Sequence, residues 1–233
     1  MRIFQKGFNF GQDGPGNRLV YHLQGCNLSC IWCSNPEGMG IHGGIDVPPA
    51  EIIKECVSAR AMFFSGGGVT FTGGEATLQH RELKEVLEGL KNVGIHTAIE
   101  TNGTSRELSV LLPFVDYLIM DFKHYDGKVL KELTGADISV VKENYETNCR
   151  ENRFQHIRIP VINGVNSHNP EKFAEYFACF NTENTVFEFL PYHEYGKDKW
   201  QSEYLVKDGF VDKDVILKFE EVFNSKNLKV VRT

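Results

Sequence analysis

The sequence predicts an α/β protein built around a parallel sheet. Segments with strand character alternate with helical segments about six times along the chain, and strands that are connected through helices run parallel to one another. Five polar motifs each follow an expected strand. Because the carboxyl ends of parallel strands gather at one edge of a sheet or one mouth of a barrel, residues far apart in the sequence are expected to meet at a single site.

The composition is typical of a soluble globular protein. Hydrophobic residues make up 41% and charged residues 24% of the 233 positions. A barrel of this length is routinely one domain, so we expect a single domain over residues 1–233. Only one cysteine-rich block is present, and a ferredoxin-like insert carrying further clusters is therefore not expected.

The charge pattern and the beginning of the chain limit the possible partners and location. The formal net charge is −6 and no Lys/Arg cluster is present, which argues against nucleic acid as the main partner. Residues 1–6 lack the apolar core of a signal peptide, and no apolar run is long enough to span a membrane. We therefore expect a cytoplasmic protein with reduced thiols and no membrane partner.

The first expected strand is Arg18–Gln24, which leads directly into the cysteine-rich segment. Its alternating apolar residues share one face, as in a half-buried strand: Leu19, Tyr21 and Leu23. The glycine-rich stretch Met39–Gly44 is expected to be a loop. A helix then begins at Pro48-Pro49, because proline is tolerated in the first turn, and extends to about Met62.

The middle of the chain continues the alternation. Val69–Thr72 and His96–Ile99 have strand character. Between them, apolar residues at i, i+3, i+4 and i+7 form one helical stripe, which Gly94 ends: Leu83, Val86, Leu87 and Leu90. A short helix over Glu107–Leu112 stops at Pro113.

The second half follows the same order. The expected strands are Tyr117–Met120, Gln155–Val161, Thr185–Leu190 and, at the end, Leu228–Val231. Pro160 indicates the end of its strand or an exposed edge. Helical sequence fills Asp126–Asn152. Two further helices are marked by apolar stripes: Phe173, Tyr176, Phe177 and Phe180, and later Val215, Phe219, Val222 and Phe223.

Three of the six cysteines lie within eight residues: Cys26, Cys30 and Cys33. Three thiolates are one short of a closed zinc site or an ordinary iron–sulfur cluster. A [4Fe–4S] cluster with three cysteine ligands keeps one iron open for a substrate. Zinc is the alternative, with His22 or His42 as the fourth ligand. The other cysteines are scattered, as buried or incidental thiols are: Cys56, Cys149 and Cys179.

Gly73-Gly74-Glu75 offers two bare backbone positions and a carboxylate. Glycine lets a ligand approach main-chain amides closely, although an ordinary turn followed by a helix N-terminal Glu explains the residues equally well. Just upstream, Gly66-Gly67-Gly68 suggests a phosphate loop. No Gly-Lys-Ser/Thr follows it, so a nucleoside triphosphate site is excluded.

Taken together, the motifs resemble those of the radical S-adenosylmethionine (SAM) enzymes that activate glycyl radical enzymes. The cysteines have the CxxxCxxC spacing of the superfamily, and the chain is most similar to the short activases of the pyruvate formate-lyase type. The other matching segments, in chain order, are Asp13-Gly14-Pro15-Gly16 with Arg18, Gly66–Thr70 before Gly73–Ala76, Thr101-Asn102-Gly103, Asp121-Phe122-Lys123, and Pro191–Lys197 with Lys199-Trp200.

The resemblance implies a partial (β/α)6 barrel with a [4Fe–4S] cluster on Cys26, Cys30 and Cys33. It also implies SAM contacts from Trp32, Ser34, Gly73, Gly74, Glu75, Glu100, Asn102, Asp121, Phe122, Lys123, Arg158 and His193. Trp32 would stack near the adenine, His193 would contact the nucleoside and Arg158 would lie near the carboxylate. Without the resemblance, Arg158 is an ordinary surface ion pair, His193 a surface histidine and Trp32 a core residue.

Two positions depart from the family pattern. Asp121 and Lys123 would help to bind a monovalent cation beside SAM, but Glu100 replaces the usual Asp and changes the expected cation site. Ser34 replaces a residue that is often His, which changes the local contacts to SAM.

The implied activity is reductive cleavage of SAM to methionine and a 5′-deoxyadenosyl radical, which removes a hydrogen atom from the Cα of a partner's glycine. No side chain is required as a general base. The implied partners are a glycyl radical enzyme, held at the mouth through Asp13–Gly16, and a flavodoxin- or ferredoxin-like electron donor; the protein itself would be a monomer. The alternatives are activation of another glycyl radical enzyme, a small-molecule substrate, or a metal-binding module without catalysis.

Overall fold

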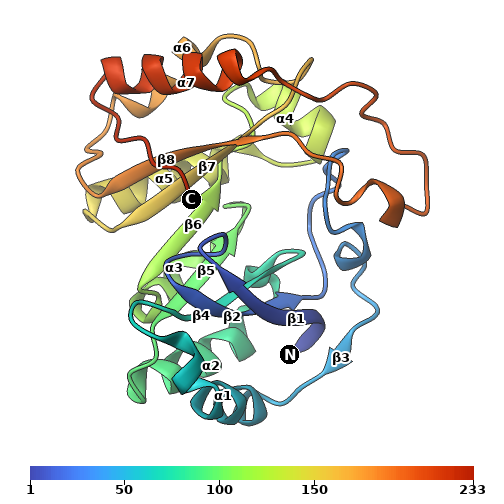
Figure 1. Cartoon of the computed structure of the whole chain (residues 1–233), viewed down its shortest axis with the longest axis vertical. Helices are drawn as coiled ribbons and strands as arrows, with labels where there is room; N and C mark the ends of the chain where they lie inside the picture. Colours follow the sequence, from blue (N-terminus) through green and yellow to red (C-terminus); the bar gives the residue numbers. More distant parts are fainter. The chain divides into compact units, whose positions relative to one another are not determined.

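The computed structural model describes residues 1–233, and the contacts divide the chain into two compact units (Figure 1). The first unit comprises residues 1–27, 35–101 and 105–119. The second comprises residues 28–34, 102–104 and 120–233. The cysteine-rich segment therefore begins in the first unit and continues in the second.

The first unit contains five strands and the beginning of a sixth. They are β1 (Arg2–Phe10), β2 (Asn17–Leu23), β3 (Ile45–Asp46), β4 (Gly68–Gly73), β5 (Thr97–Thr101) and the first part of β6 (Tyr117–Asp121). Their order is β3-β1-β2-β4-β5-β6, with β2, β4 and β5 parallel and with β1 antiparallel to both β2 and β3. The sequence predicted the parallel strands and missed β1 and β3.

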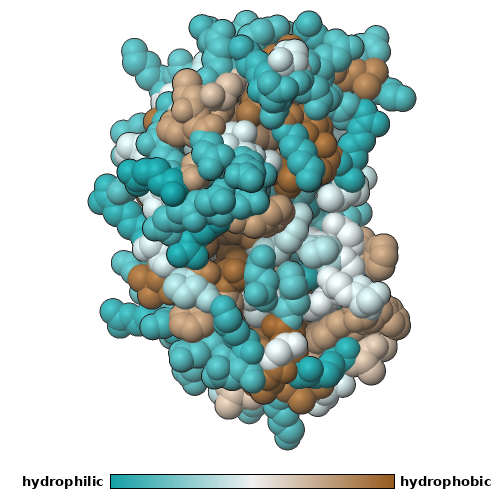
Figure 2. All heavy atoms as spheres, turned by 90° about the vertical axis from the view of Figure 1, so that its left-hand side faces the viewer, coloured by the Kyte–Doolittle hydropathy of each residue, from teal (hydrophilic) through white to brown (hydrophobic).

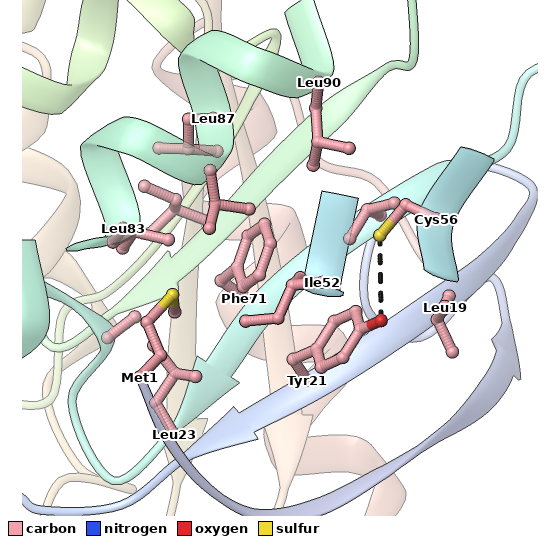
Figure 3. Close-up of a cluster of buried hydrophobic side chains, with 14 of the residues drawn as sticks. Met1, Leu19, Tyr21, Leu23, Ile52, Cys56, Phe71, Leu83, Leu87 and Leu90 are labelled. Atoms are coloured by element: carbon pink, nitrogen blue, oxygen red, sulfur yellow. Dashed lines mark hydrogen bonds between the residues drawn. The ribbon is translucent and has the colours of Figure 1, made fainter. Parts of the chain in front are cut away.

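The helices of the first unit pack on this sheet. They are η1 (Pro36–Gly38), α1 (Pro49–Ser58), η2 (Arg60–Phe63), η3 (Ala76–Gln79), α2 (His80–Asn92), α3 (Leu108–Leu111) and η4 (Leu112–Phe114). The four residues of the predicted α2 stripe are fully buried and belong to the same core as Tyr21 and Phe71 (Figure 3). The helix predicted to reach Met62 ends earlier, because the chain tightens into the 3-10 turn η2.

The second unit contains the end of β6, followed by β7 (Gln155–Val161) and β8 (Thr185–Pro191), in the order β6-β7-β8. β7 and β8 are parallel. The helices are α4 (Gly127–Thr134), α5 (Ile138–Arg150), α6 (Pro170–Phe177), η5 (Lys197–Lys199) and α7 (Lys213–Ser225). An aromatic core fills this unit, with fully buried Phe122, Phe173, Phe177, Phe187, Phe219 and Phe223.

The structure refines two predictions in the second unit and decides between the two alternatives for Pro160. The helical stretch Asp126–Asn152 is two helices, because Gly135 ends α4 in the left-handed conformation at φ 78° and Asp137 caps α5. The predicted strand Leu228–Val231 is reduced to a single bridge between Phe187 and Val230. Pro160 is the last residue but one of β7, which has neighbours on both sides, so it marks a strand end and not an edge.

The fold prediction is confirmed: the chain is an α/β protein with a mostly parallel sheet. The face shown in Figure 2 is mainly hydrophilic, with hydrophobic side chains scattered over it. None of the helices is both long enough and apolar enough to cross a membrane.

Candidate functional site

In the first unit, the carboxyl ends of three parallel strands come together. Leu23 at the end of β2 is in register with Gly73 at the end of β4. The amide of Gly74 donates to Leu23 O at 2.9 Å, and the amide of Glu75 donates to Gly25 O at 2.8 Å. The end of β5 joins them, because Thr101 Oγ1 donates to Glu75 Oε1 at 2.7 Å. The first cysteine of the motif, Cys26, directly follows this junction.

Gly73 and Gly74 are required by the packing of the main chain. A Cβ at Gly73 would lie 2.3 Å from Leu23 N, and one at Gly74 would lie 2.2 Å from Gly25 O and 2.5 Å from Gly38 O. The expectation that these glycines leave their amides open to a ligand is therefore wrong for Gly74, whose amide is bonded to β2. Their absent side chains instead allow the turn to support the start of the cysteine segment.

Glu75 is buried and well held. Its Oε1 accepts hydrogen bonds from Thr77 N at 3.0 Å, Thr77 Oγ1 at 2.5 Å and Thr101 Oγ1 at 2.7 Å. It is thus the N-terminal cap of η3, as the alternative interpretation of this motif expected. The carboxylate also stands at the junction of β4 and β5, so the cap fixes its place at the strand ends.

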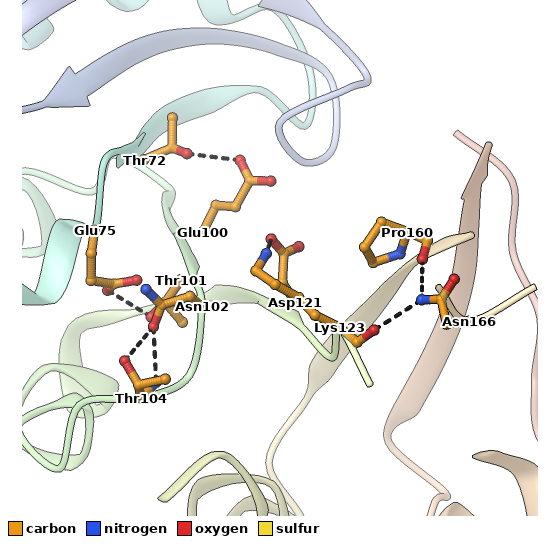
Figure 4. Close-up of polar contacts among 10 residues, drawn as sticks. All are labelled: Thr72, Glu75, Glu100, Thr101, Asn102, Thr104, Asp121, Lys123, Pro160 and Asn166. Carbon is orange, nitrogen blue, oxygen red and sulfur yellow. Dashed lines mark hydrogen bonds and ion pairs between the residues drawn. The ribbon is translucent and has the colours of Figure 1, made fainter. Parts of the chain in front are cut away.

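Glu100 lies within β5 and is partly buried. Its Oε2 accepts a hydrogen bond from Thr72 Oγ1 at 2.9 Å, which joins neighbouring strands (Figure 4). β5 ends at Thr101, two residues later than the predicted end at Ile99. Glu100 thus lies near the carboxyl ends of β4 and β5, and its part in a cation site stays a prediction.

The turn Asp13–Gly16 lies at the other end of β2. β2 starts at Asn17 and runs away from the turn toward Cys26, so seven residues of strand, or about 23 Å, separate the two. The fully buried Arg18 holds the turn, donating to Pro15 O at 3.1 Å and to Val69 O at 2.6 Å. The expectation that Asp13, Gly14, Pro15 and Gly16 line the mouth beside the cysteines is therefore wrong, because β2 points the other way.

The glycine run Gly66–Gly68 packs beside this turn. A Cβ at Gly67 would lie 2.1 Å from Asn17 O, and one at Gly68 would lie 2.1 Å from His96 O. Gly16 approaches the same run, since its Cβ would lie 2.6 Å from Gly67 N. Gly67 and Gly68 are thus explained by close contact between backbone segments at the amino ends of the strands, whereas Gly66 has open space around its Cβ position and adopts φ 86°.

In the second unit, the cysteine segment is held by the end of α4. Ser29 N donates to Thr134 O at 2.9 Å and Ile31 N donates to Leu133 O at 3.2 Å. These bonds use carbonyls that a helix end leaves without a helical partner. Cys30 is buried and Cys33 is partly exposed, with Cys33 N donating to Cys30 O at 3.1 Å. Trp32, which lies between these two cysteines in the sequence, is also buried.

The segment 196–200 contacts the same stretch from another side. Trp200 Nε1 donates to Cys33 O at 3.1 Å, and Lys199 Nζ donates to Ser34 O at 3.3 Å. A Cβ at Gly196 would lie 2.4 Å from Ser34 Cα. The sequence analysis assigned no function to Gly196, Lys199 or Trp200. Their spacing after Pro191 matched the family pattern, but this spacing does not indicate that they contact Cys33 and Ser34.

Asp121 and Lys123 form an ion pair just after β6. Lys123 Nζ lies 2.6 Å from Asp121 Oδ2 (Figure 4). Burial alone would lower the pKa of Lys123, but the Asp121 carboxylate and the neighbouring Cys30 and Cys33 raise it overall. The Lys123 side chain therefore stays protonated and pairs with the Asp121 carboxylate.

Phe122, between these two residues, faces the opposite way. Its ring is fully buried, 4.8 Å from the Phe177 ring and 5.5 Å from the Tyr176 ring. The alternation of strand side chains explains this, because neighbours of Asp121 point to the other face. The side chain of Phe122 is therefore part of the core, and a contact of this residue with SAM stays a prediction.

Asn102 forms the turn that follows β5. Its Oδ1 accepts hydrogen bonds from Thr104 N at 3.0 Å and from Thr104 Oγ1 at 2.6 Å (Figure 4). Gly103 adopts φ 73°, and its carbonyl accepts from Asn144 Nδ2 at 2.8 Å. The Thr-Asn-Gly motif is therefore a side-chain-bonded turn tied to α5.

Arg158 belongs to a buried charge cluster between β7 and β8. Arg158 and Glu188 are in register, and Arg158 Nε donates to Glu188 Oε2 at 2.9 Å. His156 Nε2 lies 3.1 Å from the same oxygen, and Thr233 N donates to Glu188 Oε1 at 2.9 Å. Burial raises the pKa of Glu188, but these partners outweigh it and lower the pKa to about 2. The interpretation of Arg158 as a surface ion pair is wrong, because both side chains are buried.

His193 follows β8 and is exposed. Its ring stacks on Tyr195 with 4.2 Å between the ring centroids, and its Nδ1 accepts from Tyr195 N at 3.4 Å. Tyr192 beside it is buried and contacts Tyr204, with 2.8 Å between the two hydroxyl oxygens. The exposed ring of His193 remains available for a ligand.

The six cysteines are all free thiols. Burial raises the pKa of Cys56 to about 12 and also raises that of Cys149, so both are poor metal ligands, while Cys179 is exposed in the turn that follows α6. Within either unit, no three His, Cys, Asp or Glu side chains form a metal site. The assignment of Cys26, Cys30 and Cys33 to a cluster, with zinc as the alternative, stays a prediction.

Comparison with known proteins identifies relatives over most of the chain. The family model described as "Radical SAM superfamily" matches residues 20–177. Pyruvate formate-lyase 1-activating enzyme of Escherichia coli K12 is 33% identical over 81% of this chain and 79% of its own length. The pyruvate formate-lyase-activating enzyme of Clostridium pasteurianum is 33% identical over 90% of this chain and 91% of its own.

Two further proteins show how widely the likeness extends. 4-Hydroxyphenylacetate decarboxylase activating enzyme of Clostridioides difficile is 29% identical over 91% of this chain and 89% of its own length. Among solved structures, a domain of pyruvate-formate lyase-activating enzyme from Bacteroides vulgatus has a TM-score of 0.61 at 25% identity. It covers 71% of this chain and 98% of the solved one.

Proposed function

The chain belongs to the radical SAM superfamily and, within it, to the glycyl-radical-enzyme activating enzymes, and we propose that its partner is a glycyl radical enzyme of the pyruvate formate-lyase type. The observation that supports this choice most is the similarity to two pyruvate formate-lyase activating enzymes, over 79% and 91% of their lengths. The activating enzyme for a decarboxylase is also similar, so the nature of the partner is the finer part of the proposal.

Membership of the superfamily implies a [4Fe–4S] cluster and SAM. Cys26, Cys30 and Cys33 would hold the cluster through their thiolates, and the superfamily spacing of these residues supports the assignment. With both groups bound, and with one electron from the donor protein, the site would supply radical chemistry, in which SAM would be cleaved to methionine and a 5′-deoxyadenosyl radical that would remove a hydrogen atom from a glycine Cα.

The chain's own residues would bind and orient SAM. Glu75 is fixed at the end of β4 by three hydrogen bonds and would receive the amino group. Arg158 is buried beside Glu188 and would face the carboxylate, while His193 exposes its ring for the nucleoside. Further contacts would come from Trp32, Ser34, Gly73, Gly74, Asn102 and Lys123.

A monovalent cation is proposed beside Asp121, whose carboxylate already pairs with Lys123. Glu100 would take part through an arm one methylene longer than the usual Asp. Activity of Glu100→Asp against the parent, in sodium and in potassium, tests this point. Identical ion dependence would remove Glu100 from the cation site.

We further propose that one core domain over residues 1–233 works as a cytoplasmic monomer and receives electrons from a flavodoxin- or ferredoxin-like protein. The Asp13–Gly16 turn is retained as a candidate contact of the partner, although it lies at the amino end of β2 and would meet a part of the partner other than the target glycine.

Anaerobic metal analysis and a SAM cleavage assay test the proposal together. We expect about four irons per chain, lost in Cys26→Ala, Cys30→Ala and Cys33→Ala but kept in Cys56→Ala, because only the first three thiols lie in the motif. Stoichiometric zinc in place of iron would contradict the cluster. SAM cleavage with a small molecule, and with no glycyl radical enzyme, would favour the small-molecule alternative.

A further inference from the structure

We propose that the segment Gly196–Trp200 is a clamp that positions Cys33 for metal binding, with the Trp200 indole as its central contact. The inference rests on the proposed function, because it assigns Cys33 as a ligand. The Trp200 N–H bonds the carbonyl of Cys33 itself at 3.1 Å, and Lys199 bonds the next carbonyl, that of Ser34, at 3.3 Å. Two consecutive carbonyls are thus held by two consecutive side chains.

The backbone of the clamp packs so closely against Ser34 that only glycine fits at position 196. Gly196 has φ −96°, which any residue can adopt, so backbone conformation does not require glycine there. What requires glycine is space, because a Cβ would lie 2.4 Å from Ser34 Cα and 2.5 Å from Ser34 O. The main chain of the clamp therefore rests directly on the main chain that follows the third cysteine.

The opposite flank of the cysteine segment is fixed independently. The amides of Ser29 and Ile31 donate to carbonyls at the end of α4. That contact holds the part around Cys30, whereas the clamp holds the carbonyl side of Cys33 and Ser34. With both sides held, the peptide planes that set the direction of the Cys33 Cα–Cβ bond have little freedom. A ligand aimed in this way binds metal at a smaller entropic cost.

The clamp is itself held by groups that do not touch the cysteines. The Trp200 ring meets the Tyr204 ring edge-on at 5.6 Å, and the Tyr204 hydroxyl lies 2.8 Å from that of the buried Tyr192. The indole is thus oriented from behind while its N–H points to Cys33. This separation provides a control, because the supporting bond can be removed while the bond to Cys33 stays.

The test compares Trp200→Phe with Tyr204→Phe. Trp200→Phe keeps an aromatic ring and removes the N–H, whereas Tyr204→Phe removes only the bond to Tyr192. The first measurement is the rate at which the reconstituted proteins lose iron to a chelator without oxygen. We expect Trp200→Phe to lose iron about two- to tenfold faster, as expected for one hydrogen bond, and Tyr204→Phe to match the parent.

The second measurement needs no metal. In the metal-free proteins, peptide mass spectrometry would follow alkylation of Cys33 relative to Cys30. Release of the Cys33 carbonyl should raise the Cys33-to-Cys30 ratio in Trp200→Phe, whereas a general loss of stability would raise both rates together. Gly196→Ala should raise the ratio further, while Gly7→Ala, where a Cβ meets nothing within 4 Å, should not change it.

The clamp would be disproved if Trp200→Phe kept the parent's iron-loss rate and alkylation ratio, or if Tyr204→Phe changed both as much as Trp200→Phe does. A wrong proposed function would be recognised by a different result, because the parent protein itself would then hold no iron–sulfur cluster. The alkylation ratio in the metal-free protein would still decide whether the clamp exists.

Discussion

At the scale of single residues, the glycines and the buried carboxylate of the Gly73-Gly74-Glu75 motif have structural roles in the turn after β4. The sequence predicted that Gly73, Gly74 and Glu75 serve a ligand, and the structure shows that two of them first serve the chain. Gly74 brings β2 and η1 into contact, and Glu75 caps η3. The sequence could not predict the packing around Gly74, because the atoms that it contacts are backbone oxygens of Gly25 and Gly38, and any residue type has such oxygens.

Gly74→Ala should therefore destabilise the protein. Its Cβ would lie 2.2 Å from Gly25 O, so backbone must move, and overpacking of this kind costs about 1–3 kcal/mol. Urea unfolding with Gly7→Ala as the matched control measures the difference. A variant as stable as the control would mean that the turn relaxes without cost.

Glu188→Gln tests the buried charge cluster through pH. The pKa of Glu188 is lowered from 4.5 to about 2, so its contribution to stability is present above about pH 4.5 and is lost as the pH falls through about 2. That contribution is on the order of 3 kcal/mol. Between these pH values the unfolding free energy of the parent should fall more steeply than that of Glu188→Gln. Parallel curves would show that the carboxylate is not stabilised by Arg158 and His156.

At the scale of elements, long periodic segments were predictable and short or exposed ones were not. β7 was predicted residue for residue, and all four stripe residues of α2 are fully buried. β1 was missed because four consecutive residues from Gln5 to Phe8 are exposed, which leaves no apolar alternation. Helix ends were missed where one residue decides, as at Gly135, whose left-handed conformation separates α4 from α5.

Leu87→Ala tests the core beneath the first unit's sheet. Leu87 is fully buried on α2, and removing its side chain should lower the unfolding free energy by about 2–5 kcal/mol. The neighbouring Glu88→Ala, on the exposed face of the same helix, should change it by less than about 0.5 kcal/mol. Equal effects in urea unfolding would contradict the assignment of the buried face.

At the scale of the whole molecule, the strand-end rule accounts for the places of the predicted site residues within each unit. In the first unit, Cys26 and Glu75 follow parallel strands and Glu100 is the last residue but one of β5. In the second unit, Asp121 ends β6, while Lys123 and His193 follow β6 and β8. The rule was not applied to the turn Asp13–Gly16, which precedes β2 and therefore lies at the other end of that strand. The clamp on Cys33 could not be predicted, because it joins segments more than 160 residues apart in the sequence.

Asp121→Asn and Lys123→Met should weaken SAM binding while leaving the iron content unchanged. Both side chains form an ion pair at the end of β6, and neither is in the cysteine motif. Equilibrium binding of SAM to the reconstituted, unreduced protein measures the effect, with Lys128→Met, an exposed residue of α4, as the control. Parent-like affinity in both variants would make the pair structural.

The proposed function requires that this chain installs a radical on a glycine of a partner enzyme. Electron paramagnetic resonance of the reduced protein, mixed with SAM and pyruvate formate-lyase without oxygen, detects such a radical. We expect a glycine-centred doublet that requires SAM and is absent with Cys33→Ala. A panel of glycyl radical enzymes that all remain without this signal, while the chain cleaves SAM with a small molecule, would contradict it.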